Sequence, residues 1–142
     1  MNYSLSTIEK GLLAANTLSA PFGLTLSAEN AALVAAAKLE AVRESGRVEF
    51  SGGVEQELIR AFSPSPYIEQ PTYAETLCEL FEIFYEQKNQ LPDDYPDDDL
   101  IIWMADAFNG RCGGSLEALR GLRPMEEPWR PEPEPDEEQA DE

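Results

Sequence analysis

The chain has 142 residues, of which 28 are acidic, 10 are basic and none is histidine, so its formal net charge is −18. This length is enough for one domain with its own hydrophobic core. The missing histidines exclude Ser-His-Asp triads, Cys-His pairs and histidine zinc sites, and the lack of clustered bases argues against direct binding to nucleic acid.

The N-terminal quarter contains the only segment that needs testing as a targeting or membrane element, residues 11–28, which carry no charge. Its continuous apolar part is too short for a signal peptide or a membrane-spanning helix, because polar and turn-forming residues interrupt it: Asn16, Thr17, Pro21 and Gly23. The sequence therefore predicts a cytoplasmic protein that does not bind membranes. For that location, Cys78 and Cys112 are expected to be two reduced thiols; a single disulfide between them is the alternative.

The first half of the chain predicts three helices. A short helix ends near Ala15, and residues 16–23 are expected to form a connection that Pro21 breaks. Ser27 is a helix N-cap for residues 28–45, which Gly46 ends. Residues 47–50 are expected to be an extended connector, and a short helix then runs from Val54 to the SPSP segment at residues 63–66.

The helix expected at residues 71–89 is strongly amphipathic. Its large apolar side chains share one side at a helical period, and Glu75, Glu79, Glu82 and Glu86 lie within about 60° of each other on the opposite side. We call these four residues the glutamate stripe. We expect it to face solvent with no base opposite it.

Two further helices are expected, at residues 97–109 and from Ser115 to about Leu122. Five aspartates before and at the start of the first of these helices are candidate calcium ligands: Asp93, Asp94, Asp97, Asp98 and Asp99. They lack the glycine and the terminal glutamate of an EF-hand loop, so no metal site and no cofactor is predicted. The glycine-rich segment 110–115 lacks the lysine of a phosphate-binding loop and is expected to be a connector.

The composition changes at residue 123, where proline and acidic residues take over. Such a segment cannot repay the entropy of ordering, so we predict a disordered tail at residues 123–142. The tail is either a solubilising appendage or a linear motif anchored by Trp129.

Several segments resemble a family of small uncharacterised Firmicutes proteins, a domain of unknown function. They are GRVEFSGG, SPYIEQPTYAETLCELFEIFYEQKN, DDDLIIWMADAFNG and GSLEALRG, and the likeness covers most of residues 22–121. The resemblance implies a bacterial cytosolic domain and no established activity. If these segments are functional, Arg47, Tyr67, Ile68 and Tyr73 form an interaction patch; alternatively, Tyr67 and Ile68 fill the core.

The predicted fold is all-α, with five or six helices in residues 1–122 and the acidic tail after them. The predicted function is non-catalytic: a protein-binding module whose acidic face meets a basic partner. The residues expected to bind that partner are Glu75, Glu79, Glu82, Glu86, Arg47, Tyr67 and Trp129. A nucleic-acid mimic and an enzyme using carboxylates or a metal are the alternatives, and the oligomeric state is left open.

Overall fold

The computed structural model describes residues 5–46, 54–91 and 95–122, and these residues confirm the all-α fold. They form five α-helices of nine or more residues, two shorter ones and two 3-10 turns. In chain order these are α1 Leu5–Ala14, α2 Asn16–Ser19, η1 Ala20–Phe22, α3 Ala28–Ser45, α4 Val54–Phe62, η2 Gln70–Thr72, α5 Tyr73–Lys88, α6 Asp97–Asn109 and α7 Leu116–Arg120.

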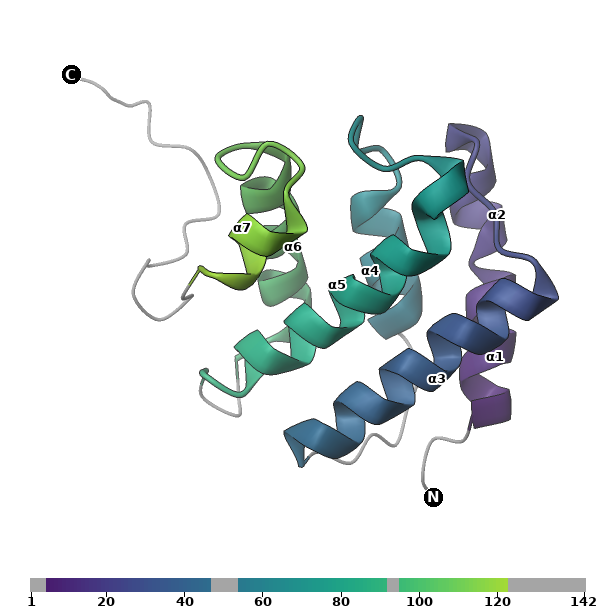
Figure 1. The fold of residues 1–142 in the computed structure, drawn as a ribbon, viewed down its shortest axis with the longest axis horizontal. Coiled ribbons are helices and arrows are strands. Elements are labelled where there is room, and N and C mark those ends of the chain that lie inside the picture. The colour runs from purple at the N-terminus through teal and green to yellow at the C-terminus, as the bar shows by residue number, and fades with distance from the viewer. Residues whose placement is uncertain (1–4, 47–53, 92–94, 123–142) are drawn as a thin grey trace.

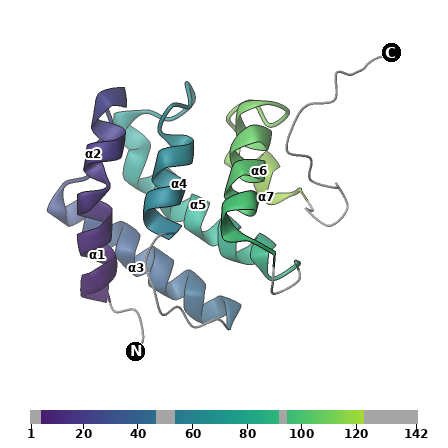
Figure 2. The ribbon, with the colours of Figure 1, turned by 180° about the vertical axis from the view of Figure 1, so that it is seen from behind.

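The helices lie in two layers. In Figure 1, α3 and α5 run side by side across the front of the molecule, and α7 lies on the same side as α5. Figure 2 shows the opposite side, where α1 with α2, α4 and α6 stand next to one another and cross α3 and α5. Helix α5 therefore has α3 and α7 as neighbours within its own layer and the second layer beneath it.

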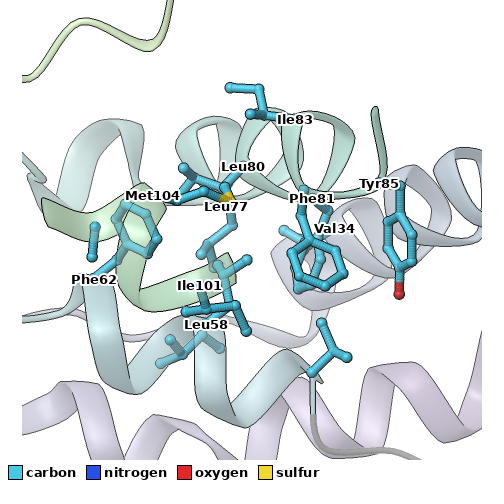
Figure 3. Packing of buried hydrophobic residues seen from close by; sticks show 14 of the residues in the cluster. Val34, Leu58, Phe62, Leu77, Leu80, Phe81, Ile83, Tyr85, Ile101 and Met104 are labelled. Atoms are coloured by element: carbon cyan, nitrogen blue, oxygen red, sulfur yellow. The ribbon is translucent and has the colours of Figure 1, made fainter. Parts of the chain in front are cut away.

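The core lies between the two layers, and α5 supplies the largest part of it. Its apolar side predicted from the sequence is buried throughout, from Tyr73 at 2% exposure to Phe84 at 0%. Figure 3 shows Leu77 of α5, Leu58 of α4 and Ile101 of α6 pointing toward one another. This burial fixes the rotation of α5 about its axis, and the rotation decides which side chains remain on the surface.

Local signals place the helix ends as predicted. The Ser27 hydroxyl accepts a hydrogen bond from the Asn30 amide at 3.1 Å, and Gly46 ends α3 in the left-handed conformation with φ 77°. The Ser115 hydroxyl likewise accepts from the Ala118 amide at 3.1 Å at the start of α7. These caps satisfy backbone groups that the helices leave unpaired.

The connection predicted at residues 16–23 is wrong, because this segment is helical. Pro21 lies near the start of η1, where a missing amide proton costs nothing. The Asn16 side chain holds the segment in place, since it accepts from the Leu26 amide at 2.8 Å and donates to the Leu26 carbonyl at 3.0 Å.

Helices α3 and α5 run in the same direction and are joined at both ends. Near their N-termini, the Gln70 amide exchanges two hydrogen bonds with the Thr25 backbone, at 2.9 and 3.0 Å. At their C-termini, the Asn89 side-chain amide donates to the Ser45 carbonyl at 3.0 Å. The outer faces of the two helices consequently form one continuous surface.

A buried ion pair joins α3 to α4 in the other layer. Lys38 and Glu55 have side chains that are 0% and 1% exposed, and Lys38 Nζ lies 2.9 Å from Glu55 Oε2. The ammonium group also lies 5.9 Å from the centre of the Phe81 ring. The pair holds the side of α3 that carries Lys38 against α4, so the opposite side of α3 faces solvent.

The connector at residues 47–50 and the tail at residues 123–142 lie outside the described residues, so their predicted conformations stay predictions. Within the described part of the chain, no helix is both long and apolar enough to cross a membrane.

Candidate binding surface on α5

Between Tyr73 and Gln87 of α5, all of which the structure describes, the four residues of the glutamate stripe are the ones that are exposed. Glu75, Glu79, Glu82 and Glu86 are all exposed, while Ile83 and Gln87 beside them are 0% and 1% exposed. The predicted solvent face is therefore confirmed. It is narrow, because α3 and α7 cover the flanks of α5.

The expectation that no base faces the stripe is wrong. The Arg120 guanidinium of α7 lies over it, with Nη1 2.8 Å from Glu86 Oε2, Nη2 3.3 Å from Glu82 Oε1 and Nη2 3.7 Å from Glu79 Oε1. Partial burial lowers the pKa of Arg120, but the carboxylates of Glu86 and Glu82 raise it more, so the group stays charged. One guanidinium thus contacts three of the four glutamates.

An acidic groove lies on the other side of the stripe, between α3 and α5. It has a volume of about 330 Å³ and is lined by Ala41, Glu44, Ser45, Glu82, Tyr85, Glu86 and Asn89. The pKa of Glu44 is raised, chiefly by its hydrogen bond with Glu40 and repulsion from it, and further by Glu82 and Glu86 across the groove. Carboxylates from two helices therefore repel one another here.

A second hollow, the α5–α7 pocket, has a volume of about 530 Å³ and is lined by Glu86, Gln87, Gln90, Glu117, Arg120 and Gly121. The Gln87 amide joins the helices, because its Nε2 donates to the carbonyls of Leu119 at 2.9 Å and Leu122 at 3.4 Å. Its Oε1 is buried and receives no hydrogen bond from the residues that the structure describes. The junction of α5 and α7 thus contains an unsatisfied acceptor.

The patch predicted around Tyr67 is not formed as proposed. Ile68 and Tyr73 are 8% and 2% exposed, because both belong to the core. Tyr67 is 48% exposed and packs edge-on against Phe108, with ring centroids 6.1 Å apart. Its ring also lies against Gly114 in the glycine-rich connector. Arg47 and Trp129, the other predicted binding residues outside the stripe, lie outside the described residues.

Two other candidates from the sequence are Asp97 and Cys78. Asp97 forms an ion pair with Lys88 at 2.5 Å between α6 and α5. Burial, helped by the nearby glutamates, raises the pKa of the Cys78 thiol to about 11, which makes it a poor nucleophile at neutral pH. The described residues contain no group of three or more Cys, Asp or Glu side chains arranged to hold a metal ion.

Sequence reasoning missed two members of this surface, Arg120 and Glu44. Glu40 and Glu44 follow each other at i, i+4 on α3, a spacing that indicates a shared face. No comparable signal exists for Arg120, because its position over the stripe depends on how α7 packs against α5.

The model of a family of unknown function (DUF6323) matches residues 11–130. No curated protein and no solved structure matches the chain.

Proposed function

Because the chain belongs to DUF6323, a family of unknown function, we propose a function from its surface: a non-catalytic module whose acidic face binds a basic surface on a partner protein. The face consists of the glutamate stripe and the acidic groove beside it.

The observation that supports this proposal is the crowding of carboxylates from two helices on one face. Glu82 and Glu86 line the groove from α5, and Glu44 faces them from α3. The pKa of Glu44 is raised chiefly by Glu40 beside it on α3 and further by repulsion from Glu82 and Glu86, as expected for negative charge that is not fully neutralised. A cationic side chain in the groove would relieve this repulsion, so binding such a group is electrostatically favourable.

Net charge strengthens the same preference. A protein with a formal charge of −18 attracts basic surfaces over a distance of about one Debye length and speeds their association. Exposed charges at the edge of a binding interface mainly determine the association rate and the salt dependence of binding. We therefore expect affinity for a basic partner to fall steeply with ionic strength.

The test compares two variants with the same change in charge. Glu82→Gln/Glu86→Gln neutralises the groove, whereas Glu69→Gln/Asp106→Asn neutralises two exposed carboxylates elsewhere. Binding of a basic peptide is measured by calorimetry at low and high salt, and circular dichroism confirms that each variant is folded. The groove variant should lose most of the affinity and much of the salt dependence.

Equal losses in the two variants would show that only net charge matters, and salt-independent binding would contradict the proposal. A nucleic-acid mimic remains the second candidate, since Arg120 contacts the stripe as a basic residue contacts successive phosphates. For a mimic, DNA or RNA should compete for the same partner. Thermal stabilisation by a divalent metal would favour the enzyme alternative instead.

A cytoplasmic location stays a prediction, as does the restriction of the family to Firmicutes. Cell fractionation tests the first.

A further inference from the structure

We propose that Arg120 is an internal competitor for the glutamate stripe: it occupies the position that an arginine of the partner takes on binding. This inference rests on the proposed function, names the partner's side chain as a guanidinium, and assigns a regulatory role to α7.

The geometry favours a guanidinium over an ammonium group. The two terminal nitrogens of Arg120 divide the stripe between them, Nη1 on Glu86 and Nη2 on Glu82 and Glu79. These carboxylates lie on successive turns of one helix, and a planar fork spans them as a single point charge does not. The stripe thus already binds arginine within this chain.

The Arg120 side chain can leave the stripe while α7 stays in place. Helix α7 is held by the fully buried Leu119 and by the hydrogen bonds from Gln87 to the carbonyls of Leu119 and of Leu122, just after the helix. The Arg120 side chain is 35% exposed, and its glutamate partners are about half exposed. Ion pairs at such exposure are individually weak and exchange readily.

A displaced Arg120 has another acceptor within reach. Glu117 precedes Arg120 by three residues on α7, a spacing at which opposite charges pair, and both residues line the α5–α7 pocket. Gln87 lines the same pocket. Pairing with Glu117 therefore offsets part of the cost of leaving the stripe.

The experiment measures binding of an arginine-rich peptide, and of the same peptide with lysines, to the full chain and three variants. Arg120→Gln removes the competitor, and Arg60→Gln is its matched control, because Arg60 is an exposed arginine paired with Glu57 on α4 in the other layer. Arg120→Lys keeps the charge but removes the fork.

If Arg120 occupies the stripe for most of the time, its removal should tighten binding of the arginine peptide by about threefold to tenfold, since apparent affinity scales with the unoccupied fraction. Arg120→Lys should also tighten it. Arg60→Gln should change affinity less than twofold, and the lysine peptide should gain less than the arginine peptide in every variant.

Equal effects of Arg120→Gln and Arg60→Gln on affinity would overturn the proposal that Arg120 is a competitor. Weaker binding of the arginine peptide by Arg120→Gln would overturn it too. Either result leaves the proposed function intact if the wild type binds in a salt-dependent manner. Failure of every variant to bind either peptide at low salt would instead remove the proposed function, and the competitor with it.

Discussion

Breaking the buried ion pair between Lys38 and Glu55 should strongly destabilise the fold. In Lys38→Met, the Glu55 carboxylate keeps its position at 1% exposure but loses the ammonium group that lies 2.9 Å away. An uncompensated buried charge of this kind costs about 3–5 kcal/mol. A domain of this size has about 5–15 kcal/mol of stability in total, so the variant should lose about a fifth of it or more.

Urea unfolding followed by far-ultraviolet circular dichroism measures the change directly. The midpoint should shift while the slope stays constant, since the surface exposed on unfolding is almost the same. The melting temperature should fall by roughly 10–20 °C. The matched control is Lys38→Met/Glu55→Leu, which removes both charges and keeps similar volumes.

The double variant should be close to the wild type in stability, or more stable by about 1–4 kcal/mol, because neither partner then has to be desolvated. A single variant within about 1 kcal/mol of the wild type would refute the reasoning. A double variant as unstable as the single one would refute it equally, since packing rather than charge would then explain the loss.

Three smaller perturbations test other parts of the structure. Gly114→Ala should lower the free energy of unfolding in urea by about 2–3 kcal/mol, because φ is +86° and a Cβ there would lie 2.4 Å from the Tyr67 ring. The control is Gly113→Ala, where φ is +57° and the space is open, so only the backbone strain of about 1–2 kcal/mol should be lost. Equal costs would contradict the contact with Tyr67. Cys78 should be alkylated about a hundredfold more slowly at neutral pH than a thiol of ordinary pKa 9.0, because its own pKa is about 11, and mass spectrometry across pH should show the rate rising toward that value. Alkylation at the rate of an exposed thiol would contradict the assignment. Glu44 binds its proton more tightly in the folded than in the unfolded chain, so stability should rise as pH falls from neutral toward 4.5. Glu44→Gln should raise the melting temperature at neutral pH and flatten this part of the profile, whereas an unchanged profile would argue against repulsion of Glu44 by its neighbours, Glu40 first and then Glu82 and Glu86.

Much of the helical framework could be predicted because its signals are local. Ser27 and Ser115 cap helices through amides three residues away, and Gly46 adopts a backbone conformation that other residues disfavour. The exposed stripe was predictable for a similar reason, since the apolar period of α5 fixes its buried side. Such features depend on a few neighbouring residues.

The features that were missed depend on contacts between distant segments. Pro21 alone suggests that residues 16–23 are not helical. They are helical because the Asn16 side chain binds the Leu26 backbone and holds the segment in place. Lys38 lies on a helix where a lysine is normally solvated, and only the position of Glu55 in another helix allows its burial. Arg120 reaches a glutamate 34 positions away only because α7 folds back against α5.

The parallel course of α3 and α5 adds negative potential to the groove beyond its carboxylates. Two helices that point the same way bring their C-terminal ends together, and each end carries the equivalent of about half a negative charge from its aligned peptide dipoles. The groove lies at these ends, since Glu44 and Ser45 belong to the last turn of α3 and Glu86 to that of α5. The peptide dipoles do not titrate, so a cation should still be attracted weakly to this end of the molecule in acid, where the glutamates have lost their charge.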